Sequence, residues 1–93
     1  MAARDGAFRA LADPTRREIL QLLRAGPLSS GEIAASFDSA WPTISRHLGV
    51  LRDAELILAE RNGNSIEYEL NTTVMQDLME SVFNLMQPGG RNA

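Results

Sequence analysis

Apolar residues recur at the three- and four-residue spacing of an α-helix in five stretches of this chain. The first, residues 5–11, is short and has to pack on other elements to persist. The second has the clearest start signal, because Asp13-Pro14 places a capping aspartate before a proline at the first helical position, and Gly26-Pro27 ends it. The last, residues 74–86, follows the cap candidate Asn71 and is apolar on more than one stripe. We therefore expect a helix in each of these three stretches.

The two middle stretches form a pair of helices joined by a short turn. Ser29 and Glu32 have the spacing of a capping box, which predicts a short helix that starts at Ser29. Ser39 is expected to cap a longer helix that contains Pro42 in its first turn and continues to Ala54. The apolar stripe of this longer helix consists of Ile44, Leu48 and Leu51. Such a pair is typical of a helix-turn-helix, in which the second helix enters a DNA major groove.

After the helix pair, two strand-like runs flank a turn. Residues 65–70 alternate strictly between apolar and polar, residues 55–61 form the preceding run, and Asn62-Gly63 between them is a strong hairpin signal. A hairpin directly after a helix-turn-helix is the wing of a winged helix. The pattern therefore predicts a mainly α fold with a small β-hairpin. This is a winged helix-turn-helix of five helices and a two-stranded wing, filling residues 1–93 as a single domain.

Charged residues are unevenly distributed along the chain. The net charge of −3 and the pI near 5.0 disfavour a nucleic-acid binder, yet all nine cations are arginine and most lie between residues 16 and 61. Arg16, Arg17 and Arg24 fall off the apolar face of the second helix, so each is expected to be solvated, with a phosphate contact as the alternative. The chain has no cysteine and no apolar run of membrane-spanning length, so we expect a soluble cytoplasmic protein without disulfides.

The start of the longer helix and the hairpin turn hold the candidate DNA contacts. An arginine such as Arg46 can form two hydrogen bonds to guanine, which are worth about 1–3 kcal/mol of discrimination. Trp41 is expected either to pack at the rim of the helix pair or to contact a thymine methyl group or a sugar. His47 is expected to be structural or to bond phosphate rather than to sense pH. The full set of candidates is Trp41, Pro42, Thr43, Ser45, Arg46, Arg17, Arg61 and Asn64.

The last predicted helix is too apolar to be covered by a domain of this size alone. A twofold copy of the chain would supply the second surface, with the first helix alongside. We expect dimerisation through residues 5–12 and 73–86, and a small-molecule pocket at the same place is the less favoured alternative. The candidate interface residues are Phe8, Leu11, Met75, Leu78, Met79, Val82, Phe83 and Met86.

Two motifs and the wing give the chain a family resemblance. Residues 8–20 read Phe-Arg-Ala-Leu-Ala-Asp-Pro-Thr-Arg-Arg-Glu-Ile-Leu, and residues 42–48 read Pro-Thr-Ile-Ser-Arg-His-Leu. Together with Asn62-Gly63 they closely resemble the ArsR-type winged-helix repressors, and among these the SdpR-type autorepressors, over residues 7–86. The resemblance implies a homodimer that binds double-stranded DNA at a palindromic operator and represses transcription, often of its own operon.

The chain departs from the metal-sensing branch of that family. Those relatives carry cysteines at the start of the helix that here begins near Ser30, or histidines with carboxylates on the last helix. This chain has Ser29-Ser30-Gly31 in the first place and only Asp77 and Glu80 in the second. We therefore expect no metal site and no cofactor. The resemblance leaves open an unidentified inducer or anti-repressor protein.

Two other classes of function are alternatives to DNA binding. A winged helix that only docks proteins is the main alternative, and the acidic pI favours it. An enzyme is not expected, although Asp13, Ser45 and His47 are the residue types of a catalytic triad. Ser45 and His47 are two positions apart on one predicted helix, so they point in different directions. Membrane insertion is not expected either.

Overall fold

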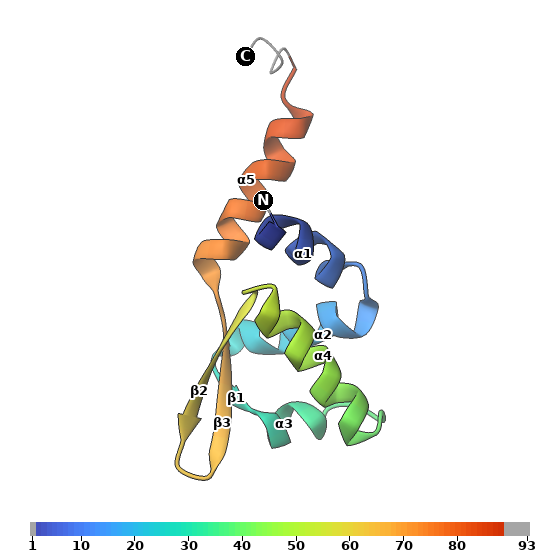
Figure 1. Ribbon diagram of the computed structural model, residues 1–93, viewed down its shortest axis with the longest axis vertical. Helices are drawn as coiled ribbons and strands as arrows, with labels where there is room; N and C mark the ends of the chain where they lie inside the picture. The colour runs from blue at the N-terminus through green and yellow to red at the C-terminus, as the bar shows by residue number, and fades with distance from the viewer. Residues whose placement is uncertain (1, 89–93) are drawn as a thin grey trace.

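The structure is a computed structural model that describes residues 2–88, and Figure 1 shows its helices and strands. The elements within that range are, in order, α1 (Ala2–Leu11), α2 (Pro14–Leu22), the 3₁₀-helix η1 (Leu23–Ala25), β1 (Leu28–Ser29), α3 (Ser30–Ala34), α4 (Trp41–Asp53), β2 (Ile57–Asn62), β3 (Ser65–Leu70) and α5 (Thr72–Met86). The predicted winged helix-turn-helix, with five α-helices and the β2-β3 hairpin as its wing, is confirmed. Residue 1 and residues 89–93 of the predicted domain lie outside the described residues.

Three helices begin at the caps that the sequence predicts. The Asp13 carboxylate accepts the backbone N–H of Arg16 at 3.1 Å and so caps α2. At α3, the Ser29 hydroxyl accepts the N–H of Glu32 at 3.1 Å, and the Glu32 carboxylate accepts the N–H of Ser29 at 2.8 Å. The Asn71 side chain caps α5. Each cap satisfies an N–H group that has no partner inside the helix.

The start of α4 differs from the prediction, because Ser39 is not its cap. Ala40 has extended backbone at φ −65° and ψ 151°, and its carbonyl oxygen accepts the N–H groups of Thr43 and Ile44 at 3.0 and 3.2 Å. The helix therefore begins at Trp41, and its cap makes no side-chain hydrogen bond. Pro42 occupies the first turn, where a missing N–H leaves no helical hydrogen bond unmade.

The wing belongs to a three-stranded antiparallel sheet with the order β1-β3-β2. β2 and β3 pair along their whole length, from Ile57 opposite Leu70 to Asn62 opposite Ser65. Gly63 turns the chain between them at φ 67°, a left-handed conformation that glycine adopts without strain. The third strand, β1, was not predicted. Its two residues are too few to show the alternation by which a strand is recognised.

The hydrophobic core holds α4 by one face and leaves most of α5 uncovered. The buried apolar residues are Ala7, Ala10, Ile19, Leu20, Leu23, Ile33, Ile44, Leu48, Leu51, Ala54, Leu56, Ile57, Tyr68 and Leu78. Leu78 is the buried residue of α5, and the rest of that helix extends away from the other elements, as Figure 1 shows. No helix within residues 2–88 is long and apolar enough to cross a membrane.

Candidate nucleic-acid interface

The two helices of the predicted helix-turn-helix are α3 and α4, which pack against each other (Figure 1). The inner face of α4 is fixed in the core by Ile44 and Leu51, which have no exposed surface. Pro42, Ser45 and Arg46 are spaced at i, i+3 and i+4, and all three are exposed on the opposite face. The first half of α4 therefore presents a polar face to a partner.

Trp41 and Thr43 flank this exposed face of α4. The Trp41 side chain is 48% exposed, so about half of its surface is available for a contact outside the chain. Thr43 is half-buried, so it is less accessible to a partner than Ser45 and Arg46 on the exposed face. The role of either residue toward DNA stays a prediction.

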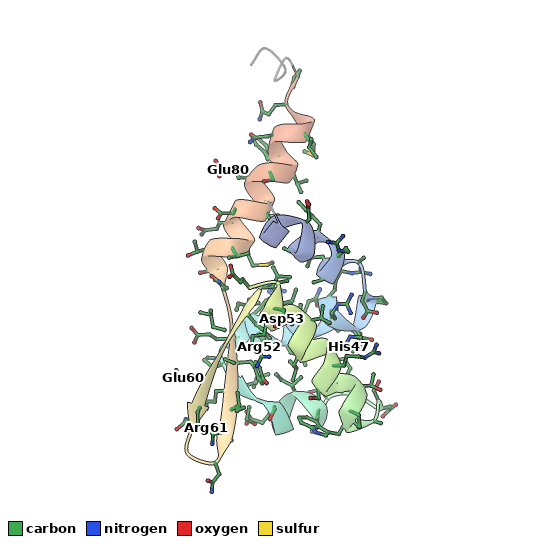
Figure 2. All side chains as sticks on the ribbon, in the orientation of Figure 1. His47, Arg52, Asp53, Glu60, Arg61 and Glu80 are labelled. Carbon is green, nitrogen blue, oxygen red and sulfur yellow. The ribbon has the colours of Figure 1, made fainter. Side chains whose placement is uncertain are left out.

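The remaining DNA-contact candidates lie on α2 and at the wing. Arg17 is exposed, and its Nη1 donates to the carbonyl oxygen of Leu11 at 2.8 Å, which places its guanidinium at the end of α1. Arg61 and Asn64 are exposed at the turn end of the wing, and Figure 2 shows Arg61 there. The structure thus divides the candidates among the start of α4, the start of α2 and the wing tip.

Sequence reasoning missed a cluster of Asp13, Arg16 and His47 behind the exposed face of α4. Arg16 is not simply solvated, as expected, because its Nε donates to the carbonyl oxygen of Ala10 at 2.8 Å and its Nη2 donates to that of Arg9 at 3.4 Å. Its Nη1 lies 3.3 Å from Nδ1 of His47. Nε2 of His47 lies 4.0 Å from Oδ2 of Asp13. No sequence signal indicates that His47 joins Asp13 and Arg16, since it lies 31 positions from Arg16 in the chain.

His47 is a structural residue of the inner face of α4. The residue as a whole is 7% exposed, and Figure 2 shows its side chain on α4. The hydrogen bond from the backbone N–H of Arg16 lowers the pKa of the Asp13 carboxyl, with positive charge nearby acting in the same direction and burial opposing it. Ser45 is exposed whereas His47 is buried, so these two residues of α4 point apart and form no nucleophile-base pair.

Comparison with known proteins places the chain in a family. A family model described as a helix-turn-helix domain matches residues 11–60, more than half of the chain. The transcriptional repressor SdpR of Bacillus subtilis is 45% identical over 85 residues, covering 91% of this chain and 94% of the relative. The arsenical resistance operon repressor of Staphylococcus aureus is 35% identical over 72 residues, covering 77% of this chain and 69% of the relative. The chain belongs to the ArsR family.

Structural comparison agrees with this assignment. The crystal structure of an ArsR family transcriptional regulator superposes with a TM-score of 0.84 at 30% sequence identity, covering 90% of this chain and 92% of that chain. The matched helix-turn-helix residues, 11–60, run from the end of α1 into the first wing strand and so include α2, α3 and α4. This ArsR-family chain is a DNA-binding transcriptional repressor and not an enzyme.

The residues of this ArsR-family repressor do not fit a thiolate metal site. The sequence contains no cysteine. Among residues 2–88, no three side chains of the types His, Asp and Glu come together in a way that could hold a metal ion. Asp77 and Glu80 on α5 are both exposed, and Figure 2 labels Glu80 on that helix. The expectation of no metal site therefore stays a prediction for the full chain.

The candidate dimer residues differ in how much surface they offer a partner. Met79, Phe83 and Met86 on α5 are 54%, 56% and 68% exposed, and with Glu80 and Val82 they line an apolar hollow of about 500 Å³. Phe8 on α1 is 39% exposed. Leu11 and Met75 are half-buried against the chain's own core, Leu78 is buried in it, and Val82 is half-buried at the hollow. Leu78, at 1% exposed, has no side-chain surface left to give to a partner.

Proposed function

We propose that this ArsR-family repressor acts as a homodimer on a palindromic operator, and that its own operon is among its targets. The observation that carries the proposal is the exposed polar face at the start of α4, where Pro42, Ser45 and Arg46 lie opposite a fully buried apolar stripe. Two relatives support it, since one is a transcriptional repressor and the other an arsenical resistance operon repressor. The resemblance to SdpR-type autorepressors supports the point about its own operon.

Sequence specificity in this proposal comes from the first two turns of α4. Arg46 donates two hydrogen bonds to O6 and N7 of a guanine, and the hydroxyls of Thr43 and Ser45 serve bases or phosphates. Trp41 lies against a thymine methyl group or a sugar with the half of its surface that is exposed. Contacts that fix the register without reading sequence come from Arg17 of α2, whose guanidinium lies at the end of α1, and from Arg61 and Asn64 at the wing tip.

The proposed dimer interface joins α1 and α5 of the two protomers. Apolar surface is exposed at Phe8, Met79, Phe83 and Met86. Burying such surface in an interface stabilises the complex by about 25 cal/mol per Å². A copy related by a twofold axis buries the same patch on both chains at once. The two α4 helices then present themselves about 34–36 Å apart, one turn of DNA, which requires half-sites about 10 bp from centre to centre.

The proposed function implies where in the cell the protein acts and which kind of signal it does not use. A repressor that binds operator DNA acts in the cytoplasm of a bacterial cell, where the operator lies. The chain offers no cysteine for a thiolate metal sensor, and the proposal leaves open whether an inducer, an anti-repressor protein or neither relieves repression. The proposal involves no cofactor and no membrane insertion.

The proposal is tested by fluorescence anisotropy of the purified protein with DNA from upstream of its own gene. A scrambled duplex of equal length and composition is the control, and both are titrated across a salt series. If each protomer neutralises three or four phosphates, the plot of log K against log salt has a slope of about −5 to −7. A preference for the upstream DNA of at least about 10³ is the expected result.

A winged helix that only docks proteins is the competing function, favoured by the net charge of −3. Weak binding with no preference for any duplex, even at low salt, would support that function and contradict the proposed one. Tight binding to a DNA other than the upstream fragment would remove autoregulation from the proposal and leave the operator-binding dimer in place. Sedimentation of the free protein as a monomer at micromolar concentration would contradict the dimer.

A further inference from the structure

The end of α1 and the middle of α4 are connected by one side chain of α2, that of Arg16. Two of its guanidinium nitrogens donate to the carbonyl oxygens of Arg9 and Ala10, and the third faces Nδ1 of His47. Those two carbonyls are among the last four of α1, which have no partner inside the helix. A guanidinium at that end also meets the negative end of the helix dipole. The end of α1 is therefore a favourable anchor for Arg16.

Arg17 also contacts the end of α1, but within residues 2–88 it forms no hydrogen bond with α4. It donates to the Leu11 carbonyl oxygen at 2.8 Å, so both arginines hold the end of α1 against α2. Of the two arginines, only Arg16 also bonds to α4 in the part of the chain that the structure describes, through its Nη1, which lies 3.3 Å from Nδ1 of His47. The connection between α1 and α4 thus depends on the Arg16-His47 pair.

The Arg16-His47 contact has a defined direction. A guanidinium has hydrogen-bond donors only, so Arg16 is the donor and Nδ1 of His47 is the acceptor. On the other side of the ring, Nε2 lies 4.0 Å from the Asp13 carboxylate. His47 is 7% exposed, so the contact is largely shielded from bulk water.

The charged side chains that face the ring, Asp13 and Arg16, both come from the start of α2. Within the described residues, no charged side chain of α1 forms a hydrogen bond or an ion pair with the ring, and α1 is connected to it only through Arg16. On α4 the adjacent Arg46 is exposed on the outer face. The ring therefore has one cation at Nδ1 and one anion near Nε2.

We infer that Arg16 is a positioning residue for DNA recognition, which fixes α4 relative to α1 through the acceptor nitrogen of His47. The inference rests on the proposed function, because α1 belongs to the proposed dimer interface. The orientation of α4 relative to α1 then sets the separation of the two recognition helices, which has to match one turn of DNA. Arg46 directly precedes His47 in α4, so a rotation of α4 that breaks the Arg16 contact also moves the guanidinium proposed to read guanine.

The test compares the wild type with Arg16→Lys, His47→Asn and His47→Gln. Random duplex DNA is first enriched for binding to the wild type, and the selected sequence and a scrambled version of it are the two probes. Lysine keeps the charge of Arg16 but has one nitrogen, which cannot reach three partners. The Asn side chain places an acceptor at the position of Nδ1, whereas the Gln side chain extends past that position.

For Arg16→Lys and His47→Gln we expect the preference for the selected over the scrambled sequence to fall about tenfold at pH 7.5, comparable to one lost base contact. His47→Asn is expected to keep the preference to within about twofold. Sedimentation and thermal unfolding of each variant show that dimer and fold are retained.

Equal preference in the wild type and Arg16→Lys, or in His47→Asn and His47→Gln, would overturn the inference. If Arg16→Lys does not fold, the comparison of His47→Asn with His47→Gln decides alone. A library that yields no preferred sequence overturns the proposed function and with it the inference. A preferred sequence that every variant binds equally well overturns the inference only.

Discussion

The side chain of Asp13 accepts a hydrogen bond from the backbone N–H of Arg16, with 3.1 Å between Oδ2 and the nitrogen. This bond is the main reason that the pKa of the Asp13 carboxyl is lowered from its ordinary value, and burial acts in the opposite direction. Because the pKa is lower in the folded than in the unfolded chain, the ionised carboxylate stabilises the fold at neutral pH. That contribution is lost as the pH falls through the lowered pKa.

Replacing Asp13 with Asn tests this relationship. Asn caps helices about as well as Asp, so the substitution removes the charge and keeps the cap. We expect Asp13→Asn to unfold at a lower urea concentration than the wild type at pH 7. The difference should shrink as the pH falls below about 3.9, the ordinary pKa of an aspartate. A difference that is the same at pH 7 and at about pH 3 would show that the charge of Asp13 does not stabilise the fold.

Gly49 lies inside α4, where glycine lowers helix stability, and it follows Ser45 and Arg46 on the same face. No atom lies within 4 Å of the place that a Cβ at this position would take, so packing inside the chain does not require glycine. We expect Gly49→Ala to raise the free energy of unfolding by up to about 1 kcal/mol. We also expect it to weaken operator binding, because the new methyl group lies on the face that approaches DNA.

Two measurements on Gly49→Ala separate these effects. Urea unfolding of the free protein reports the gain in helix stability, and anisotropy with operator DNA reports the loss of affinity. A variant that is more stable and binds operator as tightly as the wild type would show that α4 does not approach DNA closely at this residue.

The winged helix could be predicted because its signals act over a few residues. The cap at Asp13, the box at Ser29 and the turn at Gly63 each depend on neighbours within four positions, and the structure has all three. The start of α4 could not be placed with the same rules. Ser39 is a better capping residue than Ala40, but the extended backbone of Ala40 begins the helix without a side-chain bond.

Long-range contacts explain what the sequence did not predict at the candidate site. The exposed face of α4 follows from helical spacing alone, as does the burial of its inner face. Arg16 and His47 are 31 positions apart, and no local pattern indicates that they meet. Periodicity also marks every apolar residue of α5 alike, so it could not separate Leu78, which packs inside the chain, from Phe83, which is exposed.

Phe83 tests the proposed dimer interface, because its side chain is 56% exposed and lines the apolar hollow on α5. Phe83→Glu leaves the core of the protomer intact and places a charge where the partner's apolar surface would lie. Burying an unpaired charge is far more costly than burying an aromatic ring, so we expect the variant to be monomeric at micromolar concentration. Sedimentation velocity measures this directly.

The matched control for Phe83→Glu is Asn84→Glu. Asn84 is the next residue of the same helix, is exposed, and does not line the hollow. We expect Asn84→Glu to sediment as the wild type does. If both variants or neither become monomeric, the interface does not depend on the hollow at Phe83.

Arg46 and Arg17 are both exposed arginines, but the proposed function gives them different roles at DNA. Arg46→Ala should lose the preference for one guanine of the half-site, at a cost of about 1–3 kcal/mol, and leave dimerisation intact. Arg17→Ala should weaken binding to all sequences about equally and reduce the magnitude of the salt slope, since it removes a phosphate contact from each protomer. Anisotropy with the operator, a single-guanine variant of it and a scrambled duplex measures both.

Arg17 also holds the carbonyl oxygen of Leu11, so a change in fold has to be separated from a lost phosphate contact. Arg17→Lys is the control, because it keeps a cation for the phosphate and loses the guanidinium geometry at the end of α1. If Arg17→Lys restores the salt slope, the positive charge is what DNA binds. If Arg46→Ala weakens operator and scrambled DNA by the same factor, Arg46 binds the phosphate backbone and base recognition has to come from Thr43, Ser45 or Trp41.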